Sequence, residues 1–282
     1  DALTDADYNT AVGYLALSAD TLGSTSVAIG AYSLEAQNFT SATNAYNVAI
    51  GYNTGADITT GIRNTLIGGL AGDALTDADY NVAVGTGALT TDTLGSGSTA
   101  IGVDALNVQN FTSATTSYNT AVGFLAGAAV TTGVQNTLIG GLSGDAITTG
   151  DNNTAVGMAS LSSLTTADNN VAMGVSALAS TLTGAGNTAV GRSALASNTT
   201  GNDNTSLGYA SLDANTAANR NTAIGSEALS AFNVTSDTHT YNTAVGYAAG
   251  AAVTTGINNT IMGGLAGDAI TTASSNTALG YF

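Results

Sequence analysis

The sequence predicts an all-β fold in which the chain winds as a β-solenoid of about sixteen coils. Three observations predict it: a motif that returns at a fixed spacing, apolar positions that follow strand geometry, and an interior place filled once per coil. The motif is clearest at residues 9–17, 119–127 and 242–250, which read NTAVGYLAL, NTAVGFLAG and NTAVGYAAG. Repeats of this kind bury their apolar faces by stacking on one another.

Sixteen anchor residues open the coils, and each lies four residues before a glycine. The anchors are Asn9, Ser26, Asn47, Asn64, Asn81, Ser98, Asn119, Asn136, Asn153, Asn170, Asn187, Asn204, Asn221, Asn242, Asn259 and Asn276. Twelve of the fifteen spacings are 17 residues and three are 21 residues. A 17-residue unit is too short for a helical-hairpin repeat, which needs about 33 residues, and fits one coil of a β-solenoid.

The columns of the repeat have physical meanings when each coil is numbered from its anchor. Position 2 is Thr or Val, position 4 is Val, Ile, Leu or Met, and position 5 is always Gly. Alternate strand residues share a face, so positions 2 and 4 form a branched ladder and positions 3 and 5 an Ala/Gly ladder on the opposite face. The glycine indicates either a bend with positive φ or a wall too close for a Cβ atom.

The anchor asparagine suits a corner, where it tolerates a left-handed backbone and bonds to the asparagine one coil away. We interpret the anchor–glycine pairs as the residues that define the coils. Representative pairs are Asn9 with Gly13, Asn81 with Gly85, Asn153 with Gly157, and Asn221 with Gly225.

Position 9 is Leu or Gly, and position 12 compensates for it. Where position 9 is Leu, as at Leu89, position 12 is usually polar, as at Asp92. Where position 9 is Gly, as at Gly55, position 12 is aliphatic, as at Ile58. One aliphatic group per coil is therefore expected to fill one interior place from either position. The coil with both Leu161 and Leu164 breaks this rule.

We expect residues 1–282 to form a single continuous array, a segment of a longer repeat. Residues 1–72 align with 73–144 without a gap, which indicates duplicated four-coil blocks, and further coils follow over 145–282.

Composition excludes several function classes. Three Arg residues, no Lys and 19 acidic residues give a net charge of −16, so no nucleic-acid binding is expected. No apolar run is long enough for direct membrane insertion. The chain has no Cys, so disulfides and thiolate metal sites are excluded.

Three coils, opening at Ser26, Ser98 and Asn221, carry four extra residues. Each contains an N-x-[ST] sequence, at Asn38, Asn110 and Asn233. These asparagines are candidate glycosylation sites of a glycoprotein; the alternative is a turn whose Asn and Thr side chains bond locally.

Tyrosine precedes the anchor in five coils, which predicts an aromatic contact strip. Its members are Tyr8, Tyr46, Tyr80, Tyr118 and Tyr241. The strip would either pack against another chain or stack along host or matrix glycans.

No set of residues predicts an enzyme. The single histidine, His239, lies in an expected loop, and the acidic residues do not converge on one coil. The pairs Asp5/Asp7 and Asp77/Asp79 resemble the start of a calcium loop but lack its Gly and closing Glu. We therefore expect no cofactor, with Ca²⁺ as the one alternative.

The recurring pattern N-[TV]-A-[VI]-G-x-x-[AS]-[LG] resembles the head repeats of trimeric autotransporter adhesins, and similar repeats in some phage tail-fibre proteins; SVAIGAYSL at residues 26–34 is one match. The resemblance implies a left-handed parallel β-roll, usually trimeric, displayed outside the cell for cell adhesion.

The expected function is accordingly an extracellular or cell-surface structural fibre or adhesin shaft. We expect it to self-associate as a homotrimer, end to end into filaments, or both. The alternatives are a glycan-binding adhesin head, a phage tail fibre of the virion, and an ice-binding protein, for which only one Thr column argues.

Overall fold

The computed structural model describes residues 5–281, so the first four residues of block 1–72 and the last residue of the expected array lie outside it. The chain forms two compact units, Asp1–Gly141 and Leu142–Phe282, which are described one at a time. Each unit is a parallel β-solenoid, and within the described range there is no helix, hence none able to cross a membrane. The predicted fold class is confirmed. A single continuous array built from four-coil blocks stays a prediction.

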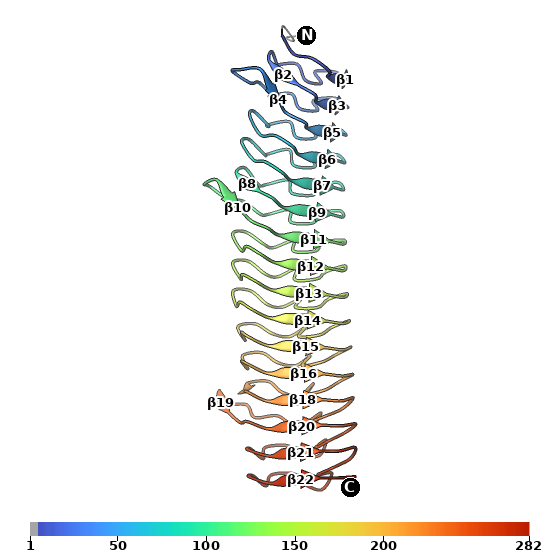
Figure 1. The fold of residues 1–282 in the computed structure, drawn as a ribbon, viewed down its shortest axis with the longest axis vertical. Helices are drawn as coiled ribbons and strands as arrows, with labels where there is room; N and C mark the ends of the chain where they lie inside the picture. The colour runs from blue at the N-terminus through green and yellow to red at the C-terminus, as the bar shows by residue number, and fades with distance from the viewer. Residues whose placement is uncertain (1–4, 282) are drawn as a thin grey trace. The chain divides into compact units, whose positions relative to one another are not determined.

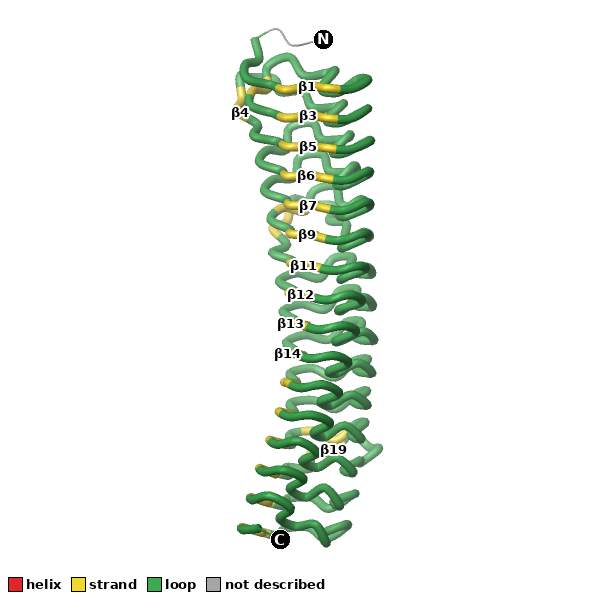
Figure 2. Tube along the Cα trace, turned by 90° about the vertical axis from the view of Figure 1, so that its right-hand side faces the viewer, coloured by secondary structure: helices red, strands yellow, loops and turns green. Residues whose placement is uncertain are grey.

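In each unit, one three-residue strand per coil contributes to a main sheet of eight parallel strands (Figure 1). In the first unit these strands are β1 (Thr10–Val12), β3 (Val27–Ile29), β5 (Val48–Ile50), β6 (Thr65–Ile67), β7 (Val82–Val84), β9 (Thr99–Ile101), β11 (Thr120–Val122) and β12 (Thr137–Ile139). In the second they are β13 (Thr154–Val156), β14 (Val171–Met173), β15 (Thr188–Val190), β16 (Thr205–Leu207), β18 (Thr222–Ile224), β20 (Thr243–Val245), β21 (Thr260–Met262) and β22 (Thr277–Leu279). Figure 2 shows that loops and turns make up most of each coil.

The strands pair in the register that the repeat predicts, position 3 opposite position 3, as Ala28 lies opposite Ala49. Position 3 faces inward: Ala49 and Ala100 are fully buried. Position 4 faces outward, and Ile50 and Ile101 are 36% and 37% exposed. The Ala/Gly ladder is therefore the inner face of the sheet, and the branched ladder is the outer face.

The glycine at position 5 meets both expectations at once. Gly13, Gly85, Gly157 and Gly225 have φ of 138°, 136°, 135° and 133°, a region that side-chain-bearing residues rarely adopt. The next coil is also too close for a side chain, since a Cβ on Gly68 would lie 2.6 Å from the carbonyl oxygen of Gly85.

The anchor asparagines form a buried ladder along each stack. The backbone N–H of Asn64 donates to Oδ1 of Asn47 at 2.9 Å, and Nδ2 of Asn64 donates to the Ala78 carbonyl at 2.7 Å. Asn81 and Asn221 bond in the same way to the preceding anchor. At Asn9 the acceptor Oδ1 receives the N–H of Ser26, and Asn153 donates Nδ2 to the Ala167 carbonyl.

One detail of the prediction for the anchors was wrong. No described anchor has a positive φ; the left-handed residue is the one immediately before it, such as Tyr80 at φ 60° or Arg220 at φ 60°. The anchor's N–H must point along the stack to reach the Oδ1 of the preceding anchor, so the turn is completed one residue earlier.

The interior confirms the compensation between positions 9 and 12 and adds position 3 to it. Leu66 replaces the usual Ala of position 3 and is fully buried. A Cβ on Gly55 would lie 2.7 Å from its Cδ1, and one on Gly72 would lie 2.9 Å from its Cδ2. Leu161 and Leu164, which break the rule, are both fully buried, and position 3 is Ala in their own coil and in the next.

Two coils of the first unit have a polar interior instead. Gln109 donates Nε2 to Oδ2 of Asp92 at 2.6 Å and to Oγ of Ser98 at 2.9 Å, and its Oε1 accepts from Nδ2 of Asn119 at 2.8 Å. The side chains of Asp92 and Gln109 are fully buried. The duplicated coil repeats the network with Asp20, Gln37, Ser26 and Asn47.

The extra residues of the long coils form loops that each pair with the preceding coil through a second short strand. The pairs are β2 (Gly23–Ser24) with β4 (Thr43–Asn44), β8 (Gly95–Ser96) with β10 (Thr115–Thr116), and β17 (Ala218–Asn219) with β19 (Thr238–His239). In Figure 1, β10 and β19 lie to one side of the main strands of their units.

Candidate functional site

The residue before each anchor forms a column on the outer surface, which we call the outer column. Its backbone is left-handed in every described coil, with φ between 50° and 71°. The column continues the coil-to-coil hydrogen bonds, since the N–H of Arg63 donates to the Ala45 carbonyl at 2.7 Å and that of Arg220 to Asn202 at 3.0 Å. This bonding holds an unfavourable backbone conformation and directs the side chains outward.

The five tyrosines of the predicted strip all lie exposed on the outer column. Their exposed fractions are 87% for Tyr8, 50% for Tyr46, 53% for Tyr80, 63% for Tyr118 and 50% for Tyr241. They do not stack on one another, because other residues of the column separate them: Thr25, Arg63 and Gly97 in the first unit. Packing against another chain and glycan binding both stay predictions.

Every arginine of the chain lies over a tyrosine ring. The guanidinium carbon is 5.4 Å from the ring centroid for Arg63 and Tyr80, 5.8 Å for Arg192 and Tyr209, and 5.9 Å for Arg220 and Tyr241. In the two pairs on the outer column the arginine also donates to the tyrosine hydroxyl, at 2.6 Å from Arg63 and 3.0 Å from Arg220. Tyrosine faces attract cations in this geometry.

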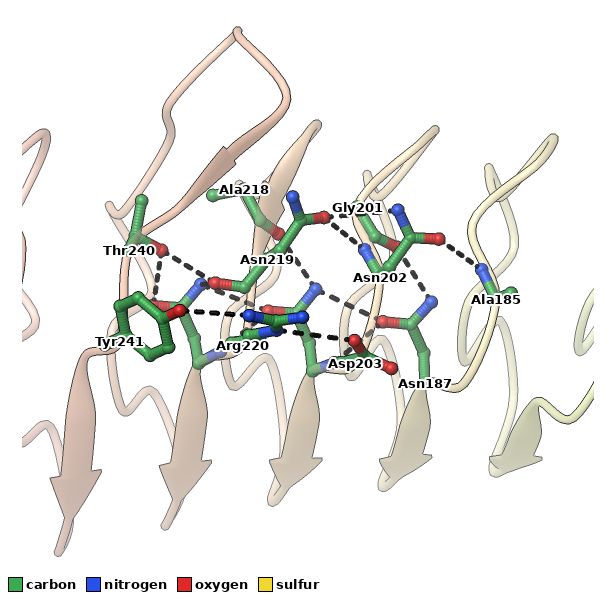
Figure 3. Close-up of polar contacts among 12 residues, drawn as sticks. Ala185, Asn187, Gly201, Asn202, Asp203, Ala218, Asn219, Arg220, Thr240 and Tyr241 are labelled. Carbon is green, nitrogen blue, oxygen red and sulfur yellow. Dashed lines mark hydrogen bonds and ion pairs between the residues drawn. The ribbon is translucent and has the colours of Figure 1, made fainter.

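Arg220 has a carboxylate on its other side. Its Nε lies 3.6 Å from Oδ2 of Asp203, one coil earlier on the same column. Figure 3 shows Arg220 between Tyr241 and Asp203. The hydrogen bond to Tyr241, and then Asp203, raise the pKa of Arg220. The outer column can thus hold a guanidinium between an aromatic ring and a carboxylate on three successive coils.

One place in the column is hollow. A pocket of about 370 Å³ opens where Gly97 lies between Tyr80 and Tyr118. The remaining lining residues are Asp79, Ser96 and Thr116. A glycine between two tyrosines of the same column is the sequence signal that could have located this pocket. An Arg one coil before a Tyr is the corresponding signal for the arginine–tyrosine pairs.

The three sequon asparagines lie at the start of the long-coil loops. Each accepts a hydrogen bond at Oδ1 from a threonine of the preceding coil: Asn38 from Thr21 at 3.2 Å, Asn110 from Thr93 at 3.1 Å, and Asn233 from Thr216 at 2.8 Å. Local bonding, the alternative interpretation, is therefore present. Asn38 is exposed and the other two are half-buried. Glycosylation at these residues stays a prediction.

The acidic pairs bond to neighbouring coils. Oδ1 of Asp77 accepts from Thr60 at 2.6 Å and Oδ1 of Asp79 from the N–H of Ile62 at 2.8 Å, whereas the backbone N–H groups of Asp5 and Asp7 donate to Thr21 and Ser24. In the part of the chain that the structure describes, no group of three His, Asp or Glu residues is placed to hold a metal ion. His239 is exposed on β19, with its ring centroid 6.0 Å from that of Tyr241.

Comparisons with protein-family models, with curated proteins and with solved structures find no match to this chain.

Proposed function

We propose that the chain is the structural shaft of an extracellular fibre or adhesin, and that its copies associate side by side through the outer face of the main sheet. The carrying observation is the row of exposed apolar side chains at position 4. Its most exposed members are Val12, Ile29, Ile50, Ile67, Ile101 and Ile139 in the first unit, and Met173, Leu207, Met262 and Leu279 in the second. Contiguous apolar surface on a soluble protein is typical of an interaction site.

The charge distribution supports lateral association. Positions 2–4 of every coil contain only Thr, Val, Ala, Ser, Leu, Ile and Met, so the main sheet carries no charge. The net charge of −16 arises from residues in the turns and loops. Copies can therefore bring these faces together around a common axis without bringing like charges together, while the charged edges keep other orientations apart.

The resemblance to adhesin head repeats supports an extracellular location and a trimer, and the repetitive surface supports a structural role over a catalytic one. End-to-end joining of stacks stays a prediction.

Association can be tested by sedimentation velocity of the full chain over a range of concentrations. We expect a trimer, and we expect the variant Ile50→Thr/Ile67→Thr/Ile101→Thr to shift it toward the monomer. Thr is already common at position 2 of the same strands, so these strands should form in the variant.

The matched control is Val108→Thr/Leu182→Thr, which removes exposed apolar groups outside the main sheets. It should leave the trimer intact. A wild-type chain that stays monomeric at every concentration, or a control that dissociates as readily as the triple variant, would contradict lateral association through this face.

Glycan binding is the second candidate, favoured by a cluster of outward tyrosines in the first unit. The ring centroids of Tyr14 and Tyr32 are 5.5 Å apart, and those of Tyr32 and Tyr52 are 5.9 Å apart, both edge to face. Tyr14 and Tyr52 are 67% and 60% exposed, so their rings are available to a sugar. Binding on a glycan array that Tyr52→Ala abolishes would establish this function, and an array without binding would exclude it.

A further inference from the structure

The pocket at Gly97 is an interruption of the outer column. Among the other fifteen described residues of the outer column, only Gly186 also lacks a side chain. Gly97 contributes only backbone, and Tyr80 and Tyr118 stand two strand spacings apart along the column, about 10 Å. A Cβ on Gly97 would lie 4.0 Å from Cδ1 of Tyr118, so this ring borders the empty place. A volume of about 370 Å³ lies within the range of pockets that hold small ligands, about 300–1,000 Å³.

The chain's own arginines indicate which chemical group can occupy a position of the outer column beside a tyrosine. Arg63 stands one coil before Tyr80, and Arg220 stands one coil before Tyr241; both place the guanidinium on the ring and bond to its hydroxyl. Gly97 holds the same place relative to Tyr118. The tyrosine is present, and the side chain that would cover it is missing.

A carboxylate lies near both places, although not at the same position. Arg220 has Asp203 one coil before it on the outer column, at 3.6 Å. At the pocket that position is Tyr80, and the carboxylate among the lining residues is Asp79, which precedes Tyr80 in the chain. The backbone N–H of Ile62 donates to Oδ1 of Asp79 at 2.8 Å, which holds the carboxylate. The backbone N–H of Asp79 donates to Oγ of Ser96 at 3.0 Å, which ties the main chain to the next coil.

We propose that the Gly97 pocket binds the guanidinium group of an arginine side chain supplied by a partner polypeptide. The group would lie against Tyr118, the tyrosine of the pocket that no arginine of the chain covers, and balance the charge of Asp79. The net charge of −16 attracts basic partners in general, and the pocket selects the arginine. The guanidinium of Arg63 already lies over Tyr80, 5.4 Å from its ring centroid, whereas none of the chain's three arginines, all within the described residues, lies over Tyr118. This inference does not depend on the proposed lateral association.

The duplicated block offers an internal control. The pocket residues Asp79, Tyr80, Ser96 and Tyr118 correspond to Asp7, Tyr8, Ser24 and Tyr46. Gly97 corresponds to Thr25, whose φ of 65° is close to the 71° of Gly97. Gly97→Thr therefore fills the pocket with a side chain that the same backbone already accepts in the same chain, and Thr25→Gly removes that side chain from the corresponding place.

The experiment is a titration of the ¹⁵N-labelled full chain with N-acetyl-arginine amide, followed by the amide resonances of Gly97 and Tyr118. We expect a saturable shift with a dissociation constant on the order of 1 mM, as suits one side chain. Gly97→Thr should weaken binding at least tenfold, and Asp79→Asn, which keeps the Oδ1 acceptor, should weaken it severalfold. Thr25→Gly should create a second saturable site, reported by residue 25 and Tyr46.

Two results would overturn the proposal. One is an unchanged titration in the Gly97→Thr variant, whose fold is checked by its remaining amide resonances. The other is a shift of the Gly97 resonance by methyl α-glucoside with none by N-acetyl-arginine amide, which would make the pocket a sugar site.

Discussion

The long coils that open at Ser98 and Asn221 fill the same interior place in opposite ways. Position 12 is Gln109 in the first, where it bonds to Asp92, Ser98 and Asn119. Position 12 is Phe232 in the second, fully buried. In the coil with Gln109 the phenylalanine comes from position 14 instead, where Phe111 is 5% exposed.

The difference explains the two anchors that are not asparagine. Ser26 and Ser98 are the only serine anchors, and their coils are the only ones with Gln at position 12. In both, the glutamine Nε2 bonds to the serine Oγ, at 3.2 Å for Gln37 and 2.9 Å for Gln109. A polar interior therefore needs matched residues in several columns, because each buried polar atom must find a partner. An apolar interior needs only a suitable volume.

The largest expected effect is on the aromatic side of this comparison. Phe232→Ala should lower the free energy of unfolding by about 3–5 kcal/mol, because it removes a fully buried ring and leaves a cavity. Urea unfolding followed by circular dichroism measures it. Val234→Ala, a half-buried residue of the same loop, is the control and should cost much less. A loss below 1 kcal/mol for Phe232→Ala would show that its coil is not tightly packed.

On the polar side, Gln109→Met should cost about 1–3 kcal/mol, because it roughly preserves volume but leaves the buried Oδ2 of Asp92 without its hydrogen bond. The other two partners of Gln109 keep a second hydrogen bond, Ser98 with Oγ of Ser117 and Asn119 with the Gly133 carbonyl. The same substitution at the exposed Gln135, Gln135→Met, is the matched control and should leave the urea midpoint almost unchanged. Equal effects at the two sites would mean that the network contributes nothing.

The smallest expected effect is a dependence on pH, which the aromatic interior lacks. Burial raises the pKa of Asp92, although hydrogen bonds from Gln109, Phe111 and Gly95 oppose the shift. With a raised pKa, the folded chain keeps a proton that the unfolded chain has already released, so the contribution of Asp92 to stability is fully present below pH about 4 and is lost as the pH rises through the raised value. Burial raises the pKa of Asp73, Asp145 and Asp213 in the same direction.

Melting temperatures between pH 4 and pH 7 test this expectation. The wild-type value should fall across that range, and Asp92→Asn should show a smaller fall, because the amide does not titrate. A wild-type melting temperature that rises from pH 4 to pH 7 would contradict the assigned sign.

Much of the fold could be predicted because the repeat reports on neighbouring coils directly. The 17-residue spacing, the strand at positions 2–4 and the glycine at position 5 recur along the chain, so the pattern cannot be a coincidence of a few residues. The exchange of the interior aliphatic residue between position 9, as at Leu89, and position 12, as at Ile58, could also be predicted from the sequence, because both positions belong to one coil. The role of Leu66 was not, because it acts on the glycines at position 9 of its own coil and the preceding one.

The candidate site was predictable only in part. The outward tyrosines could be found because they share a column. The arginine–tyrosine pairs and the Gly97 pocket depend on which residues fall next to each other across 17 or 21 residues, and on a left-handed backbone that directs them outward.

The sequence by itself determined the repeat length, the strands, the register and the residues able to face each other, because a backbone that bonds coil to coil keeps each strand position opposite the same position of the next coil. The tertiary structure decided which face of the sheet is inside, where the left-handed residue lies, and which side chains of neighbouring coils meet. Those outcomes depend on the direction in which each Cα–Cβ bond leaves the coil, and that direction is set only when the whole turn closes.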